Sequence, residues 1–325
     1  MSQFAADVRI VTELRAHPDA DRLELAKVND LDYQMVVGKG EFVTGDRVLY
    51  LPLDAVLPDG LRDMIGLKKN RVKTIKLRGE ISQGVLVPIV SLLSHFKIGT
   101  DLAPVLGITK YDAEDHASLG EGTRTTLPAG VSVYDIENAE RFKAHAAELL
   151  AGGHVVTEKL EGTNFCAVLD EQNEYFVCSR KHTVDGDTIY NRVAEAYGIR
   201  SVLATIKELY KASHVSIHGE IIGPRVQGNY YDRPKLELYV FDIKVDHKWL
   251  DWLPFAATMG ACAYHIPLVP VLPSYDPQNG GKSLLAPDKL REGVVIRPVN
   301  ERYDHQLGRL ILKFKNPEYL LHEKS

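Results

Sequence analysis

Short runs of apolar and β-branched residues, separated by turn residues, fill the first hundred positions of the 325-residue chain. Glycine and proline mark the turns between these runs. Five or six short strands in such a stretch are typical of a small barrel, which closes a sheet on itself. We therefore expect a small β-barrel module over residues 1–105. The runs are VRIVTEL, LELAKV, YQMVVG, RVLYLPL, VKTIKL and GVLVPI.

The rest of the chain differs from this pattern, and its length predicts a second domain. Residues 106–130 are polar and rich in turn formers, which indicates a linker. Residues 131–325 mix strands and helices, so the expected fold class is α+β. One helix is expected over residues 135–150, and the other helices in DTIYNRVAEAYG, SVLATIKELYKA and LDWLPFAATMGACAY. Strands are expected in HVVTEKL, FCAVLD, YFVCSRK, HVSIHGEIIG, LELYVFDIKV, GVVIRP and RLILKFK.

Composition excludes several classes of protein. With 45% hydrophobic and 26% charged residues, the chain is typical of a globular protein. No apolar run approaches the roughly 20 residues that span a membrane, and the N-terminus lacks the features of a signal peptide. The three cysteines are widely spaced without a CxxC, which argues against disulfides and zinc and favours a reducing, cytoplasmic setting. No obligate protein partner is evident.

Charge gives one local signal. The net charge of −5 indicates no general affinity for nucleic acid, but LKKNRVKTIKLR at residues 67–78 is basic. Lys76 and Arg78 alternate with apolar residues, so we expect them to share one face of a strand. A solvated face and a stripe that binds phosphates both remain open. The basic residues are Lys68, Lys69, Arg71, Lys73, Lys76 and Arg78.

Five strand-like segments of the second half carry charged residues where a buried strand would carry apolar ones. The first contains Lys159 between two glutamates, and taken alone it favours a surface lysine paired to its neighbours. Five such segments together predict a charged cleft lined by strand edges. They are EKLEGTN at 158–164, CSRKH at 178–182, HGEIIGP at 218–224, REGVVIRP at 291–298 and LKFKNPEYL at 312–320.

This ordered set resembles the covalent nucleotidyltransferases, which include ATP-dependent DNA and RNA ligases and mRNA capping enzymes. EKLEGTN looks like motif I (KxxG), SR like motif Ia, HGE like motif III, LYVFDI like motif IIIa, EGVV like motif IV and LKFK like motif V. A lone KxxG is weak, but six matches in order are specific. KxxGTNF, GEIIGPRVQGNYY, YVFDI and KFKN favour the RNA ligase 2-like group. HPDADRLELAKV, VVGKGEF, GDRVLYLPLDAVLP and SQGVLVP resemble an OB-type tRNA-binding module.

The resemblance implies an ATP-dependent RNA ligase that joins an RNA 3′-OH to a 5′-phosphate, with a nicked duplex as the expected partner. Lys159 would attack the α-phosphate of ATP to give lysyl-AMP, and AMP would then pass to the RNA 5′-phosphate. The attack needs a neutral amine, whereas a free lysine has a pKa of about 10.4. We expect Lys313 and Lys315, on one face of a strand, to lower that pKa.

Three glutamates are the expected metal site. Glu161 alone would raise the pKa of Lys159, whereas a hydrated Mg²⁺ or Mn²⁺ ion beside it would reverse the local charge. Glu220 and Glu292 are the expected partners of that ion, through its waters. Glu158 precedes Lys159 in a strand and should point to the other face.

The resemblance also implies nucleotide and RNA contacts. Phe241 is expected to stack on adenine, and Gly162 to let the backbone approach the nucleotide. Asn164 and Arg180 are placed for ribose or the 5′-phosphate. Asp242 remains open between orienting a lysine and a structural role. The full expected ATP or AMP set is Glu158, Lys159, Gly162, Asn164, Arg180, Glu220, Phe241, Glu292, Lys313 and Lys315. The expected RNA set is Arg180, Lys181, Lys69, Arg71, Lys73, Lys76 and Arg78.

Three alternatives remain. DNA ligases and GTP-dependent capping enzymes usually add a C-terminal OB domain, for which we expect no room after Lys315. A non-catalytic RNA-binding protein should have lost the motif lysines or carboxylates, and all are present. The barrel module has two possible roles, binding RNA or supporting the structure.

Overall fold

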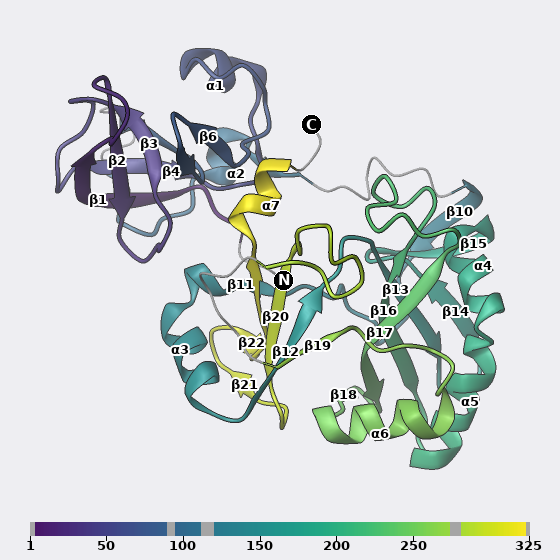
Figure 1. Ribbon diagram of the computed structural model, residues 1–325. Helices are drawn as coiled ribbons and strands as arrows, with labels where there is room; N and C mark the ends of the chain where they lie inside the picture. The colour runs from purple at the N-terminus through teal and green to yellow at the C-terminus, as the bar shows by residue number, and fades with distance from the viewer. Residues whose placement is uncertain (1–3, 90–94, 112–119, 274–280, 323–325) are drawn as a thin grey trace. The chain divides into compact units, whose positions relative to one another are not determined.

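The computed structural model describes residues 4–89, 95–111, 120–273 and 281–322. The chain divides into two compact units (Figure 1). The N-terminal unit comprises residues 2–113, 138–143 and 317–325. The two-sheet unit comprises residues 114–137 and 144–316. Among the described residues, no helix has both the length and the apolar character needed to cross a membrane.

The N-terminal unit is built on a five-stranded antiparallel sheet in the order β3-β2-β1-β4-β8. A bulge between Val11 and Glu13 lets β1 bend and pair with both β2 and β4. Alternate residues of β4 enter two hydrophobic clusters, so both faces of this strand are buried. Each main strand overlaps a predicted run. They are β1 (Asp7–Ala16), β2 (Leu23–Val28), β3 (Met35–Gly38), β4 (Arg47–Leu51) and β8 (Val85–Pro88).

Short elements complete this unit, and one of them corrects a prediction. The strands β6 (Ile75–Leu77) and β7 (Glu80–Ser82) form a hairpin whose turn is Arg78–Gly79, with φ of 49° and 98°. Arg78 therefore lies in a turn with left-handed backbone, and the prediction that it continues the strand face of Lys76 was wrong. The other elements are β5 (Ala55–Val56), α1 (Asp59–Met64), α2 (Ala103–Leu106), β9 (Thr109–Lys110), η3 (Ala139–Arg141) and α7 (Pro317–His322).

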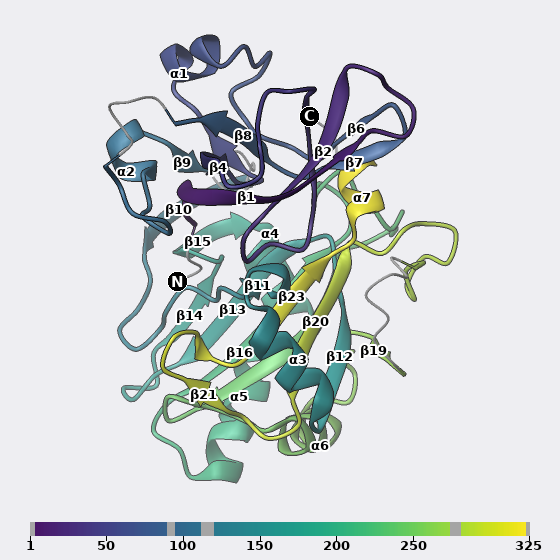
Figure 2. The ribbon, with the colours of Figure 1, turned by 90° about the vertical axis from the view of Figure 1, so that its left-hand side faces the viewer.

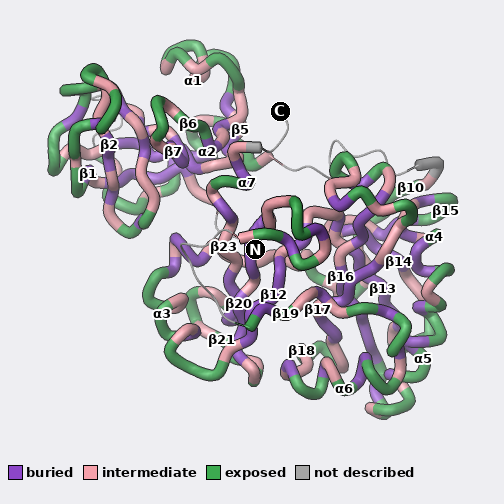
Figure 3. The backbone as a smooth tube through the Cα atoms, in the orientation of Figure 1, coloured by how far each residue is buried: buried purple, intermediate pink, exposed green. Residues whose placement is uncertain are grey.

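The larger sheet of the two-sheet unit has seven antiparallel strands in the order β10-β15-β14-β13-β16-β17-β18. Its central strands are buried, while the outer sides of α4 and α5 are exposed (Figure 3). The strands are β10 (Gly120–Thr126), β13 (Thr163–Leu169), β14 (Tyr175–Cys178), β15 (His182–Thr188), β16 (Val215–Ile222), β17 (Glu237–Val245) and β18 (Lys248–Trp249). The helices are α4 (Ile189–Ala196), α5 (Ile199–Tyr210) and α6 (Trp252–Cys262).

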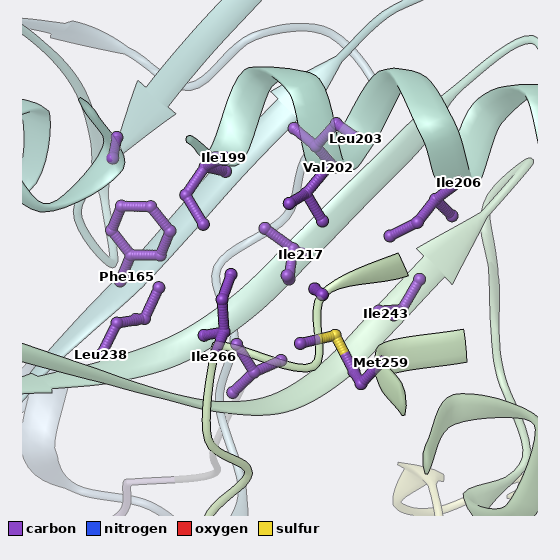
Figure 4. Close-up of a cluster of buried hydrophobic side chains, with 14 of the residues drawn as sticks. Phe165, Ile199, Val202, Leu203, Ile206, Ile217, Leu238, Ile243, Met259 and Ile266 are labelled. Atoms are coloured by element: carbon purple, nitrogen blue, oxygen red, sulfur yellow. The ribbon is translucent and has the colours of Figure 1, made fainter. Parts of the chain in front are cut away.

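The main hydrophobic core lies between these helices and one face of the seven-stranded sheet. Ile199, Val202 and Ile206 recur at helical spacing on α5 and point toward Ile217 of β16 (Figure 4). Phe165 of β13 is fully buried in the same cluster. Because the core occupies one face of the sheet, the other face is left to carry polar side chains.

The smaller sheet has the order β11-β23-β20-β12-β19, and Figure 2 shows these strands side by side. An ion pair between Glu148 and Arg302 and a contact of His145 with Asp304 connect α3 to the residues around the β21–β22 hairpin. The elements are β11 (Glu137–Asn138), α3 (Lys143–Ala151), β12 (His154–Lys159), β19 (Val271–Leu272), β20 (Gly293–Pro298), β21 (Tyr303–Asp304), β22 (Gly308–Arg309) and β23 (Leu312–Lys315).

Two stretches differ from the prediction. The stretch 106–130, expected to be a linker, contains β9 and β10, and β10 pairs along its length with β15. Threonine favours strands even where flanking glycines suggest a turn. The helix expected over 135–150 begins only at Lys143, because β11 joins the smaller sheet and η3 follows it. Pairing within the fold thus overrides the local helical pattern.

Candidate active site

The turn after Lys159 carries the chain from one sheet to the other. Lys159 ends β12 of the smaller sheet, and Thr163 begins β13 of the larger one. Leu160 is buried within this turn. A side chain at Gly162 would place its Cβ 2.4 Å from the Ile221 carbonyl oxygen, so glycine is required for the turn to lie against β16. The backbone at Gly162 therefore lies close to β16, whereas the sequence led us to expect a close approach to the nucleotide.

Strand register aligns the predicted lysines. Lys159 lies opposite Gly293, which in turn lies opposite Lys315, so the two lysines share one face of the smaller sheet. Thr157 and Lys313 are aligned on the same face, two residues along. Gly293 contributes no side chain between Lys159 and Lys315. This register brings the motif I and motif V lysines together, as the sequence predicted.

The larger sheet presents the remaining predicted groups on the face opposite the main core. Asn164 of β13 lies directly opposite Glu220 of β16. A bulge next to His218 makes Phe241 the extra residue of β17, and its side chain packs against a separate hydrophobic cluster that includes Leu160. Bulges of this kind turn a side chain toward a site. Asn164, Glu220 and Phe241 are thus positioned from neighbouring strands.

Carboxylates dominate the surroundings of Lys159. Its Nζ lies 2.5 Å from Oε1 of Glu292. Burial by itself would lower the pKa of Lys159, but the negative charges of Glu292, Glu220 and Glu161 outweigh it and raise the pKa. We expected Lys313 and Lys315 to lower the pKa of Lys159. With the charges of the protein alone, the carboxylates raise it instead. The amine is held protonated until positive charge is brought to the carboxylates.

Glu292 fits a role in binding a cation. It is only 4% exposed, and among the described residues none donates a hydrogen bond to its Oε2. Its backbone carbonyl accepts a hydrogen bond from the Asn316 amide at 2.8 Å, which fixes this residue at the start of β20. A buried carboxylate oxygen without a donor is costly unless a cation or water satisfies it. In the described part of the chain, no set of three or more metal-binding side chains is arranged as direct ligands.

Glu158 is engaged inside the unit. It is 1% exposed, its Oε2 accepts a hydrogen bond from the Leu284 amide at 2.8 Å, and burial raises its pKa. Its own backbone N–H donates to the Pro270 carbonyl at 2.8 Å. The backbone N–H and one side-chain oxygen of Glu158 therefore already have partners within the protein.

Arg180 and Lys181 lie in the turn between β14 and β15. Arg180 forms an ion pair with Asp135 at 3.0 Å, and its side chain is about one quarter exposed. This ion pair holds the planar guanidinium in one place.

Asp242 belongs to a buried charged network. One of its oxygens accepts a hydrogen bond from Arg297 at 2.8 Å, and the other accepts from Arg309 at 2.7 Å and from the Tyr134 hydroxyl at 2.6 Å. Glu301 pairs with both arginines. Because Asp242 is on β17 and Arg297 on β20, the network joins the two sheets, and of the two roles left open for Asp242 this geometry favours the structural one.

Sequence reasoning missed several residues of this region. Tyr134 packs against the ring of Phe241 with centroids 4.8 Å apart, yet it lies in a stretch without a motif. Arg297 and Arg309 look like ordinary strand charges in the sequence. Tyr231 accepts a hydrogen bond from the Glu161 amide at 2.8 Å, and its presence in the run GNYY was the one signal that could have found it.

The predicted basic stripe of the N-terminal unit is not uniform. Arg71 forms an ion pair with Asp54 at 2.6 Å and stacks on the ring of Tyr111 at 3.7 Å. It therefore supports the unit from inside. Four of the other basic residues are exposed, and Lys73 is partly buried. The exposed ones are Lys68, Lys69, Lys76 and Arg78.

Comparison with known families covers both units. A family described as RNA ligase matches residues 153–315, and an OB-fold domain family matches residues 5–89. The curated relatives include the phenylalanine–tRNA ligase β subunits of Geobacter sulfurreducens, 37% identical over 114 residues, and of Legionella pneumophila, 32% identical over 131 residues. These matches cover 33% and 39% of this chain. The chain spans only 13% and 14% of those relatives.

Solved structures similar to the whole chain include two of the Naegleria gruberi RNA ligase. A lysine-to-alanine mutant of that ligase, with ATP and Mn, matches with a TM-score of 0.82 at 22% identity, covering 98% of both chains. A glutamate-to-alanine mutant, also with ATP and Mn, matches with a TM-score of 0.81 at 23% identity, covering 98% of this chain and 99% of the other. The predicted α+β fold, with an OB module before a domain of antiparallel sheets, is confirmed.

Proposed function

The chain belongs to the RNA ligase family, and we propose that it joins RNA ends by using ATP and a divalent metal ion. Membership confirms the predicted family. It favours joining of RNA ends over the DNA ligase and capping-type activities. We further propose that the reaction uses ATP and a metal ion. The covalent intermediates and the type of RNA end are also proposed below.

The observation that carries the proposal is the placement of Lys159 among three carboxylates. Glu292, Glu220 and Glu161 all raise its pKa, and Glu292 lies within hydrogen-bond distance. An amine held in this way is protonated and unreactive at neutral pH. A site with excess negative charge that must accept a triphosphate needs a cation, which would supply charge neutralisation when bound.

The residues fit such a cation. Glu292 has a buried oxygen without a donor among the described residues, and Glu161, Glu220 and Glu292 are the groups we propose to hold the ion through its waters. The similar Naegleria gruberi structures contain ATP or AMP together with Mn, which supports the same choice of nucleotide and metal class here.

We propose that Lys159 is the nucleophile. Its neutral amine would attack the α-phosphate of ATP, forming the N–P bond while the bond to pyrophosphate breaks and the amine loses a proton. Lys315, across Gly293, and Lys313 lie on the same face as Lys159. Their ammonium groups suit the developing phosphate charge. AMP would then pass to an RNA 5′-phosphate, and the attack of a 3′-OH would release it.

Further contacts follow from the geometry. Phe241, half-buried beside Tyr134, offers an aromatic face to adenine. Asn164 shares a face with Glu220 and is proposed to contact ribose, while Arg180 and Lys181 meet the RNA 5′-phosphate. The buried cysteines Cys166 and Cys178 are free, which suits a reducing intracellular setting.

The N-terminal unit is proposed to bind RNA. The OB-fold match over residues 5–89 supports this role. Four exposed cations are suited to phosphates. They are Lys68, Lys69, Lys76 and Arg78. Arg71 is less suited because its guanidinium is committed to Asp54 and Tyr111.

Nick sealing tests this function directly. The full chain is incubated with ATP, Mg²⁺ and a duplex carrying one nick with an RNA 3′-OH and a 5′-phosphate, beside the same strands unannealed. We expect joined product from the duplex, none without ATP, and none from GTP. Joining that proceeds equally with GTP, or only on DNA 3′-OH ends, would contradict the proposal. A Glu161→Gln variant tests the metal site. If it is adenylylated with the same dependence on the metal ion as the wild type, Glu161 does not hold the ion.

A further inference from the structure

The turn that carries Lys159 and Glu161 is tied to a loop of unusual backbone. The loop follows β16 and precedes β17. Four of its non-glycine residues have left-handed backbone, a conformation that is unfavourable for L-residues. Such residues persist where the surrounding structure fixes them. They are Arg225 (φ 68°), Gln227 (φ 43°), Asn229 (φ 54°) and Asp232 (φ 51°).

The loop is held from several sides. The Asn229 side chain bonds both the carbonyl and the amide of Arg233, at 2.9 and 3.0 Å. Lys289 donates to the Tyr230 carbonyl at 2.5 Å and forms an ion pair with Asp232, so the main chain of the loop is held without the Tyr230 hydroxyl. These bonds make the loop a fixed platform, so a side chain that projects from it has a defined position.

Tyr231 is that side chain. It is 5% exposed and packs with Leu160 and Ile222. Its hydroxyl oxygen accepts a hydrogen bond from the Glu161 amide at 2.8 Å. Burial raises the pKa of Tyr231 above its ordinary value, so the hydroxyl stays neutral. Glu161 lies in a turn outside the strand ladders, and the phenol oxygen is the partner its amide has among the described residues.

We propose that Tyr231 is a positioning residue for lysine adenylylation, which fixes the turn between Lys159 and Glu161. This inference rests on the proposed function. The bond acts on the backbone of Glu161, so it sets where that carboxylate and the neighbouring amine stand relative to Glu220 and Glu292. A displacement of about 1 Å at a reacting group can cost about a hundredfold in rate.

The adjacent tyrosine provides a matched control. Tyr231→Phe removes the hydroxyl that meets Glu161, and Tyr230→Phe removes a hydroxyl from the same loop that meets Leu290 instead. Each variant loses one hydrogen bond and keeps its aromatic ring, so both are expected to fold. We expect Tyr231→Phe to slow single-turnover adenylylation at least about tenfold with little change in the KM for ATP, and Tyr230→Phe to stay near the wild-type rate.

Amide hydrogen exchange gives a readout independent of activity. The Glu161 amide should lose protection in Tyr231→Phe but keep it in Tyr230→Phe, while β16 amides stay protected in both and verify folding. Equal adenylylation rates in the two variants, or an unchanged Glu161 amide in Tyr231→Phe, would overturn the inference. If the wild-type chain forms no adenylate, the proposed function fails, and Glu161 exchange still decides whether Tyr231 fixes the turn.

Discussion

The amine of Lys159 stands 2.5 Å from a carboxylate oxygen of Glu292, at the point where the chain crosses between the two sheets. With Glu220 and Glu161 nearby, this pair holds a proton on the group that adenylylation would require in its neutral form. Activation of Lys159 therefore depends on neutralising the surrounding carboxylates. The central feature of the site is this excess of negative charge.

Removing the nearest carboxylate should lower the pKa of Lys159. We expect the Lys159 amine in Glu292→Gln to react with an amine-directed reagent at lower pH than in the wild type, because one stabilising anion is gone. Mass spectrometry of the peptide that contains Lys159, over a pH series, measures this. Exposed Lys76 in the same digest serves as the control, and an identical titration of Lys159 in both proteins would contradict the account.

The network around Asp242 predicts a large stability effect. Asp242→Asn leaves Arg297 and Arg309 buried with less negative charge, and breaking such a pair costs about 3–5 kcal/mol. Urea denaturation should show a lower midpoint. Asp187→Asn removes an ion pair in which both side chains are more than half exposed, so its midpoint should match the wild type. Similar midpoints for the two variants would argue against a structural network.

His214 makes the fold sensitive to acid. It is 2% exposed, and burial lowers its pKa, with further lowering by His247 and Lys244 and an opposing effect of Asp170 and Glu171. The unfolded chain then binds a proton below about pH 6.5 that the folded chain does not, so stability falls as pH drops. The loss is at most about 1.4 kcal/mol per pH unit.

His214→Gln removes this titrating group. The difference in free energy of unfolding between pH 7 and pH 5 should therefore be smaller in the variant than in the wild type. Urea denaturation at the two pH values measures it. An equal difference in both proteins would show that His214 titrates alike in the folded and unfolded chain.

The basic residues of the N-terminal unit should separate into two groups. Arg71→Ala removes an ion pair and a stacked ring contact, so we expect a lower melting temperature. Replacing exposed Lys76 and Arg78 together by Ala should leave melting unchanged and weaken RNA binding. The dependence of binding on salt should become less steep, because each phosphate contact releases counterions. Binding titrations at several salt concentrations test this, and an unchanged slope would favour a structural role for the unit.

The fold was largely predictable where side chains alternate regularly. β16, β17 and β20 lie within the predicted runs, since buried strands carry recognisable apolar patterns. β15, with the sequence HTVDGDT, was missed because its polar and glycine residues look like a loop and its pairing with β10 is a long-range contact. The helix expected from residue 135 begins only at Lys143, because the pairing of β11 within the smaller sheet is also a long-range contact.

The candidate site was predictable as a set of residues, whereas its electrostatics were not. The ordered motifs that resemble those of the covalent nucleotidyltransferases nominate Lys159, Glu220, Glu292 and Lys315. The sign of the pKa shift at Lys159 depends on distances across two sheets, which no local pattern contains. The contact of Tyr231 with Glu161 likewise joins positions 70 residues apart.

Covalent labelling tests the central claim most directly. The full chain is incubated with α-labelled ATP and Mg²⁺, denatured, and separated on a gel, beside Lys159→Ala and exposed Lys76→Ala. The account predicts label that survives denaturation in the wild type and in Lys76→Ala, and none in Lys159→Ala. Label retained by Lys159→Ala, or no label in the wild type, would contradict it.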